Sequence, residues 1–164
     1  MCSKFFMGEI TTVRHMLNTF AVSVWFLTQI SQTFGQNTCF EDQKLNLLQL
    51  KDSLKYNSSY STKLIQWNQT PDCCAWPGVS CDSHGAVAAL DLSDDSIFDG
   101  LDHSTALTSL TSLQSLNLSR NSFITQKIPS FIHKLTTLTE LNLGSTNLSG
   151  PINDSLANLR FLSK

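Results

Sequence analysis

The chain has 164 residues, of which 41% are hydrophobic and 15% are charged. This length and composition fit a single globular domain and exclude fibrous and intrinsically disordered proteins. The formal net charge is -2, and no cluster of lysines and arginines could bind phosphates. We therefore expect that the chain neither binds nucleic acid nor is a basic membrane-surface protein.

Residues 1–35 have the features of a secretory signal peptide. Lys4 and Arg14 precede the apolar stretch MLNTFAVSVWFLTQI at residues 16–30, and small and polar residues follow it. A spanning helix needs about 20 apolar residues. Because this stretch is shorter and is interrupted by polar side chains, a membrane anchor is the less favoured alternative.

Cleavage of the signal peptide sets the number of cysteines. Thr33 and Gly35 are small residues that suit the cleavage site, which gives a mature chain from Gln36; Ser31 and Thr33 are an alternative pair. Cys2 is lost with the signal. The cysteines that stay are Cys39, Cys73, Cys74 and Cys81. Secretion exposes them to an oxidising compartment, where their even number predicts disulfides.

Four cysteines allow three pairings. A bond between Cys73 and Cys74 would be strained, because adjacent side chains do not approach with a relaxed disulfide dihedral. Of the other two pairings we favour Cys74 with Cys81, which closes a tight loop, and Cys73 with Cys39. A metal site is a weaker alternative because no histidine lies at ligand spacing beside the cysteines, so we expect no metal and no cofactor.

The segment EDQKLNLLQLKDSLKY at residues 41–56 predicts an amphipathic helix. Its acidic residues come first and its lysines late, which suits the helix dipole, and leucines at 47, 50 and 54 recur at helical spacing. Cys39 ties down its start, and its leucines are expected to cover the end of another element. Trp67 and Trp76 are expected in the same small core.

A repeated apolar pattern occupies the rest of the chain. Three segments read L-x-x-L-x-L-x-x-N-x-L, with valine, isoleucine or phenylalanine at some apolar positions: VAALDLSDDSI (87–97), LQSLNLSRNSF (113–123) and LTELNLGSTNL (138–148). They begin 26 and 25 residues apart, and a fourth begins 24 residues later at Leu162. These intervals and shared positions indicate leucine-rich repeats.

Each repeat predicts one short strand. Leu116 and Leu118 alternate with polar residues, so we expect them to point inward while their neighbours face solvent. Asn121 should turn inward and use its amide as both donor and acceptor. Asp95 and Thr146 hold the equivalent positions. An ionised Asp cannot donate a hydrogen bond and Thr is shorter than Asn, so we expect the ladder that these side chains form along the repeats to be imperfect there.

The expected fold is α/β: a short leucine-rich repeat solenoid, with one parallel strand per repeat and a disulfide-stapled N-terminal helical cap. A cap is needed because the end of a solenoid exposes the leucines of its first turn. The predicted boundaries are 1–35 for the signal peptide, 36–84 for the cap and 85–164 for about three repeats that are open at the C-terminus.

The segments CFEDQKLNLLQLKDSL (39–54) and LIQWNQTPDCCAWPGVSCD (64–82), with the repeats after them, resemble plant extracellular leucine-rich repeat proteins. In particular they look like receptor-like proteins of the wilt-resistance type, whose cap motif is C…W…CC-x-W-x-G-V-x-C and whose long first repeat is similar to residues 89–123. The resemblance covers residues 37–164. It implies an ectodomain that binds a pathogen- or self-derived ligand outside the cell, in defence or developmental signalling.

The resemblance also implies the partners and the location. The expected partners are an extracellular peptide, protein or glycan ligand and a co-receptor kinase, because such proteins lack a kinase of their own. Family members carry many more repeats, a second cysteine cap and a membrane-spanning helix, whereas this sequence ends at RFLSK. We therefore expect passage through the secretory pathway, then the extracellular face of the plasma membrane for a full-length receptor and the apoplast otherwise. Membrane attachment is expected only through a C-terminal helix that is absent from this chain.

Two other functions are alternatives. One is a secreted protein that resembles polygalacturonase-inhibiting proteins, although about three repeats are at the lower limit of stability. The other is a truncated product without function, whose exposed Leu156, Leu159 and Leu162 would favour aggregation. The sequence contains no phosphate loop, kinase motif, nucleophile elbow or zinc signature, so we do not expect an enzyme.

Ligand contacts are expected on the concave face of the sheet, at solvent-pointing positions. The candidates are Asp91, Ser93, Ser115, Asn117, Arg120, Glu140 and Asn142. Arg120 and Glu140 are the first to mutate because charged groups form directional contacts. Five sequons predict N-glycosylation, at Asn57, Asn68, Asn117, Asn147 and Asn153. Asn57 and Asn68 in the cap loops are the favoured sites, and a glycan on Asn117 would shield the concave face.

Overall fold

The computed structural model describes residues 38–101, 105–124 and 127–149. The chain divides into two units, Met1–Gln36 and Asn37–Lys164, and all described residues belong to the second. The predicted signal peptide, the sequon at Asn153 and the last three leucines, at 156, 159 and 162, lie outside the described residues. Within the described part, no helix is long and apolar enough to cross a membrane.

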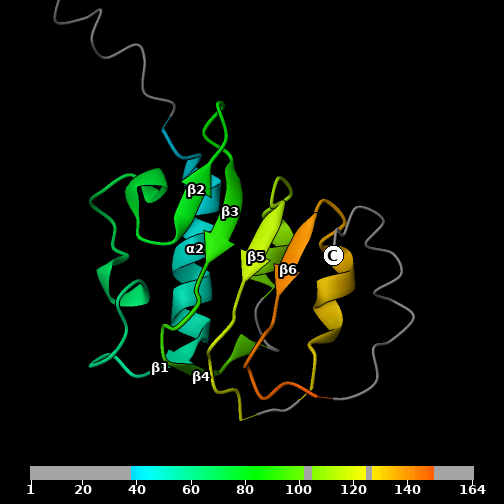
Figure 1. Cartoon of the computed structure of the whole chain (residues 1–164). Coiled ribbons are helices and arrows are strands. Elements are labelled where there is room, and N and C mark those ends of the chain that lie inside the picture. Colours follow the sequence, from blue (N-terminus) through cyan, green and yellow to red (C-terminus); the bar gives the residue numbers. More distant parts are fainter. Residues whose placement is uncertain (1–37, 102–104, 125–126, 150–164) are drawn as a thin grey trace, which may run out of the picture. The chain divides into compact units, whose positions relative to one another are not determined.

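Three parallel strands, one from each repeat, form most of the main sheet (Figure 1). They are β3 (Val87–Asp91), β5 (Ser115–Asn117) and β6 (Glu140–Asn142), and Leu90, Leu116 and Leu141 are in register across them. Leu90 and Leu116 are each 1% exposed, whereas the next residue of each strand faces solvent more openly. The predicted parallel sheet with inward leucines is therefore confirmed.

A fourth strand, which the repeat pattern does not predict, extends this sheet on the side of the cap. β2 (Val79–Cys81) pairs with β3 in the antiparallel direction, so the strand order is β2-β3-β5-β6. The turn between them is closed by Asp82, whose Oδ1 accepts hydrogen bonds from His84 N at 2.8 Å and Ala86 N at 3.0 Å. These bonds lower the pKa of Asp82. The cap thus covers the first repeat by continuing its sheet.

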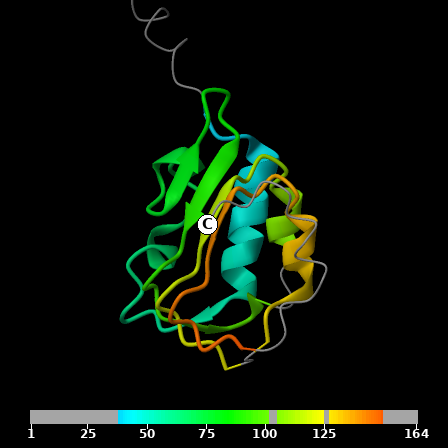
Figure 2. The same ribbon diagram turned by 45° about the vertical axis from the view of Figure 1, so that its right-hand side comes forward.

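The helix α2 (Glu41–Ser53) packs on one side of the sheet, and no other helix or strand of the described residues covers the opposite side (Figures 1 and 2). Leu47 and Leu50 are fully buried, and Gln43 accepts a hydrogen bond from Val87 N at 2.6 Å through Oε1. The predicted helix is confirmed with Leu47 and Leu50 on its buried side, although it ends at Ser53 and Leu45 is exposed. The chain becomes extended at Leu54, and a short strand begins directly after it.

This short strand belongs to a second, two-stranded sheet at the end of the helix. β1 (Lys55–Tyr56) pairs in the antiparallel direction with β4 (Ile97–Asp99). Gly100 follows β4 with a φ of 93°, and a Cβ atom at this position would collide with the backbone of Ser53 and Leu54. A glycine therefore allows the first repeat to approach the helix end closely.

One hydrophobic core runs through the cap and the repeats. In the cap, the rings of Trp67 and Trp76 stack with centroids 5.3 Å apart, and Trp67 Nε1 donates to Pro77 O at 3.0 Å. The shared tryptophan core is therefore confirmed. In the repeats, the short 3-10 helices η4 (Ala106–Ser109) and η5 (Ser130–Lys134) return the chain and bury Leu107 and Ile132.

Candidate functional site

The uncovered side of the main sheet carries most of the predicted contact residues. We call it the open face, defined by Asp91, Ser115, Asn117, Glu140 and Asn142. Asp91, Asn117 and Asn142 lie in register in one row, and Ser115 pairs with Glu140 in a second row. In the second row, Ser115 Oγ donates a hydrogen bond to Glu140 Oε2 at 3.1 Å. The open face therefore presents polar side chains from three neighbouring strands.

The row of Asp91, Asn117 and Asn142 has the same local turn in each repeat. The Oδ1 atom of each accepts a hydrogen bond from the backbone N–H two residues later, at 2.8 Å from Ser93, 3.1 Å from Ser119 and 3.0 Å from Gly144. Because an N–H donates, the atom that it meets must be the oxygen. The Nδ2 donors of Asn117 and Asn142 are thus directed away from their own turns.

A lysine of the cap reaches the first strand of the open face. Lys63 Nζ lies 3.0 Å from Asp91 Oδ1 and also donates to Ser93 O at 2.9 Å and Ser93 Oγ at 3.2 Å. Partial burial alone would raise the pKa of Asp91, but the hydrogen bonds from Ser93 and Lys63 outweigh it and lower the pKa. Lys63 was not predicted, because no motif links it to a position 28 residues away.

Arg120 occupies a turn rather than a strand. It adopts a φ of 58°, and Asp94 and Ser145, at the same position in the other repeats, have φ values of 54° and 57°. The reason is the buried Asn121 beside it, which holds the chain in a tight turn. The exposed Arg120 therefore lies beyond the end of β5, at the rim of the open face, and Ser93 lies at the same end of the sheet.

The buried ladder behind the open face matches the prediction at Asn121. Its Oδ1 accepts from Asp95 N at 3.3 Å and Ile97 N at 3.0 Å, and its Nδ2 donates to Leu92 O at 2.8 Å and Leu118 O at 2.9 Å. Thr146 keeps only part of this role, with a hydrogen bond from Oγ1 to Leu143 O at 2.6 Å.

Asp95 cannot donate a hydrogen bond, but this does not leave its position short of hydrogen bonds. Its carboxylate is fully buried and accepts four hydrogen bonds from the cap: from Ser61 Oγ, Thr62 N, Lys63 N and Leu64 N, at 2.7–2.9 Å. Here the neighbour on the N-terminal side is a loop rich in N–H donors instead of another repeat. An acceptor-only side chain suits that neighbour, so Asp95 joins the cap to the first repeat.

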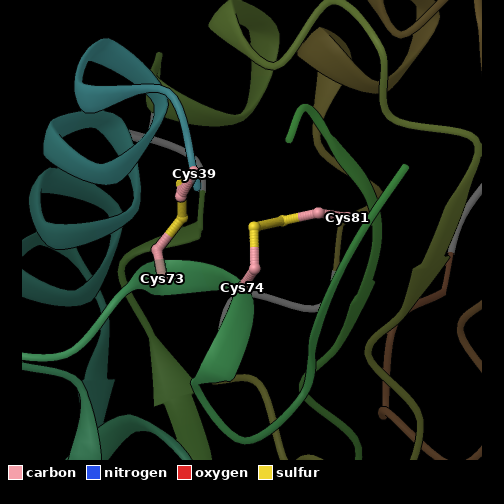
Figure 3. Close-up of side chains that lie close together, drawn as sticks. All are labelled: Cys39, Cys73, Cys74 and Cys81. Carbon is pink, nitrogen blue, oxygen red and sulfur yellow. A yellow bond between two sulfur atoms is a disulfide. The ribbon is translucent and has the colours of Figure 1, made fainter. Parts of the chain in front are cut away.

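The structure joins Cys39 to Cys73 and Cys74 to Cys81, which is the pairing favoured from the sequence (Figure 3). Cys73 and Cys74 lie together on η2 (Cys73–Ala75), between the start of α2 and strand β2. Asp72 supports this junction, because its Oδ1 accepts from Cys39 N at 3.1 Å and from Cys74 N at 2.8 Å. The four sulfur atoms lie within 4.8 Å of one another, but sulfurs joined in disulfides are not the thiolates that bind metal ions.

A shallow polar groove lies where the strands begin. It has a volume of about 430 Å³ and is lined by Asp82, Thr111, Ser112, Gln114, Thr137 and Thr139. Two of its hydroxyls connect neighbouring repeats, since Thr137 Oγ1 donates to Leu113 O at 2.7 Å and Thr139 Oγ1 donates to Gln114 O at 3.1 Å. These bonds give the groove a structural role.

The sequons differ in their surroundings. Asn57 and Asn68 are exposed in the cap loops, Asn147 is exposed in the third repeat, and Asn117 is half-buried on the open face. In three of them, Oδ1 accepts from the N–H of the sequon's own Ser or Thr: Ser59, Thr70 and Ser119.

Two family models match the chain. The leucine rich repeat N-terminal domain matches residues 40–82, and the Leucine Rich Repeat matches residues 112–135 and 137–159. Among curated proteins, the chain is 35% identical over 141 residues to Receptor-like protein 7 of Arabidopsis thaliana, an alignment that covers 85% of the chain and 14% of that protein. It is 33% identical over 165 residues to Receptor-like protein EIX2 of Solanum lycopersicum, covering 89% of the chain and 15% of the relative. The chain therefore spans about one seventh of the length of these relatives.

Solved structures share the fold. The BIR2 ectodomain of Arabidopsis thaliana is 28% identical with a TM-score of 0.60, covering 76% of this chain and 65% of that one. A plant ice-binding protein is 32% identical with a TM-score of 0.61, covering 77% and 39%. The ectodomain of the receptor kinase GASSHO1/SCHENGEN3 of Arabidopsis thaliana, in complex with CASPARIAN STRIP INTEGRITY FACTOR 2, is 26% identical with a TM-score of 0.59, covering 73% and 14%. With its N-terminal domain followed by repeats, the chain belongs to the leucine-rich repeat proteins, and over most of its length it is similar to plant receptor-like proteins.

Proposed function

We propose that the chain is the N-terminal part of an extracellular recognition module of a plant receptor-like protein, in defence or developmental signalling. The observation that carries the proposal is the open face, where three strands present polar side chains in register beside a cap with two disulfides. One fold can serve unrelated functions, so the surface and not the fold supports this proposal.

The chemistry of the open face favours a peptide or protein ligand. Its donors and acceptors lie close together: the Glu140 carboxylate with the Ser115 hydroxyl that binds it and, at the rim, the Arg120 guanidinium. A peptide offers backbone donors and acceptors at a similar spacing. The similar GASSHO1/SCHENGEN3 ectodomain forms a complex with CASPARIAN STRIP INTEGRITY FACTOR 2, which supports ligand binding by an ectodomain of this fold. A co-receptor kinase is the proposed signalling partner, as the resemblance to receptor-like proteins implies.

The proposal includes the route through the cell. The predicted signal peptide directs the chain to the secretory pathway, and both disulfides require an oxidising compartment. When the chain is expressed in plant cells with a C-terminal reporter, we expect it in the apoplastic fluid. Its Cys39, Cys73, Cys74 and Cys81 should not react with a maleimide after denaturation. Retention in the cytosol with these four thiols reactive would overturn the proposal.

Recognition is tested in the full-length gene product, after a cDNA read across the codon for Lys164. Plants that carry the Arg120→Ala and Glu140→Ala double variant should lose the oxidative burst that a fungal culture filtrate elicits with the unchanged receptor. Asp52→Ala with Lys134→Ala is the matched control, because both residues are exposed and lie on α2 and η5, away from the open face. An equal loss in both double variants would argue against recognition by this surface.

A further inference from the structure

Asn117 combines a sequon with an unusual position, in the middle of the open face. Its Oδ1 is held by the N–H of Ser119 at 3.1 Å, so its Nδ2 is directed away from the turn. Among the described residues, no acceptor binds this Nδ2. Its neighbours in the row, Asp91 and Asn142, are exposed on either side. In the described part of the chain, the buried side-chain nitrogen and oxygen atoms without a partner do not include this one, so the amide nitrogen is accessible.

The amide nitrogen is the atom to which an N-linked glycan is attached in Asn-x-Ser/Thr. Ser119 supplies the hydroxyl of this sequon, and its backbone N–H also fixes the Asn117 oxygen in the fold. A sugar on Nδ2 leaves that hydrogen bond intact. Asn121 shows the opposite case: its Nδ2 is buried and donates to Leu92 O and Leu118 O, so a substituent there would disrupt the core.

Asn68 is a weaker fit than its exposure indicates. Its Nδ2 donates to Gln66 O at 2.9 Å, and a glycan would have to replace this hydrogen bond. Among the described residues, the Asn57 side chain has a hydrogen bond only at Oδ1, from Ser59 N at 3.0 Å. The geometry therefore favours Asn57 and Asn117 over Asn68 as glycan sites.

We propose that Asn117 carries an N-linked glycan that covers the middle of the open face. The proposal rests on the proposed function in one respect: the chain must enter the secretory pathway. Neighbouring strands lie about 4.8 Å apart, so Asp91 and Asn142, on the two sides of Asn117, both lie within reach of a branched glycan attached there. Ligand contacts then shift to the ends of the strands, where Glu140 and Arg120 lie.

The third repeat contains a natural control. Asn142 lies in register with Asn117 and makes the same turn, with Gly144 N in place of Ser119 N. Because Gly144 has no hydroxyl, Asn142 is not a sequon. Gly144→Ser creates one at a position where the preceding repeat already accommodates a serine. Ser119→Ala has the opposite effect, since it removes the sequon and keeps both Asn117 and the backbone N–H.

The experiment is glycopeptide mapping by mass spectrometry of the full chain secreted from plant cells. We expect a glycan on the Asn117 peptide of the unchanged chain, its loss in Ser119→Ala, and an additional glycan on Asn142 in Gly144→Ser. An unmodified Asn117 peptide beside a glycosylated Asn57 peptide would overturn this inference and leave the proposed secretion intact. If no sequon is modified and the chain stays in the cell, the proposed function itself fails.

Discussion

The cap and the repeats reach the same kind of packed interior by different means. In the repeats, each turn of chain contributes the same inward leucines and one polar residue at the ladder position. In the cap, single long-range contacts replace repetition: disulfides, the Gln43 bond to Val87 N, and the four donors that surround Asp95. The comparison indicates that the residue at the ladder position matches the hydrogen-bonding groups of the segment packed against it. Asn suits a repeat on both sides, and Asp suits a loop of N–H donors.

Exchanging the two ladder side chains tests this comparison most severely. Asn121→Asp should lower the free energy of unfolding by about 3–5 kcal/mol, because a buried carboxylate would face Leu92 O and Leu118 O. Asp95→Asn should cost about 1–3 kcal/mol, since weaker hydrogen bonds replace those to a carboxylate and an amide N–H₂ meets donors. Urea unfolding of the secreted chain measures both. Equal costs would mean that the position and not its neighbour determines the residue.

The two disulfides should differ in their contribution. They join residues 34 and 7 positions apart, and a longer loop restricts the unfolded chain more strongly. Loop entropy gives about 4 kcal/mol for Cys39–Cys73 and about 2.5 kcal/mol for Cys74–Cys81. The paired variants Cys39→Ala/Cys73→Ala and Cys74→Ala/Cys81→Ala compare them in the same urea assay. A larger loss from opening the shorter loop would contradict the idea that the first bond anchors the helix.

The ion pair between Lys63 and Asp91 should have the smallest effect. The Asp91 side chain is 52% exposed, so solvent screens the pair and a double-mutant cycle should give at most about 1 kcal/mol. The folded pKa of Asp91 lies below its ordinary value of 3.8. This contribution is therefore fully present above pH 3.8 and is lost as the pH falls from there through the folded pKa. A coupling energy that did not weaken in acid would indicate that Lys63 acts through packing alone.

The sequence predicted the parts of the fold that repeat. Leucines at fixed intervals specify β3, β5 and β6, and the inward position of Asn121 follows from the same pattern. The strand pairs at the cap were missed because the repeated pattern does not mark β1, β2 and β4 as strands, whereas the equally short β5 and β6 lie at its central leucines. Their partners are also distant, as in the pairing of Lys55 with Asp99.

The candidate site was predicted in part for a similar reason. Alternation along a strand places Asp91, Asn117 and Asn142 on the solvent side, and the structure aligns them in one row. Alternation does not reveal that Lys63 comes from the cap to bind Asp91, nor that Arg120 lies in a turn. Both depend on how segments far apart along the chain meet. The four cap donors around Asp95 were missed for the same reason.

Native-state hydrogen exchange of the full chain tests the central claim, that the cap and the first repeats form one cooperative unit through Asp95. The amides of Thr62, Lys63 and Leu64, which bind this carboxylate, should open with the same free energy as those of Leu92 and Gln114, which connect neighbouring repeats. If the three cap amides exchange at a lower free energy while Leu92 and Gln114 remain protected, the cap unfolds separately and the claim is wrong.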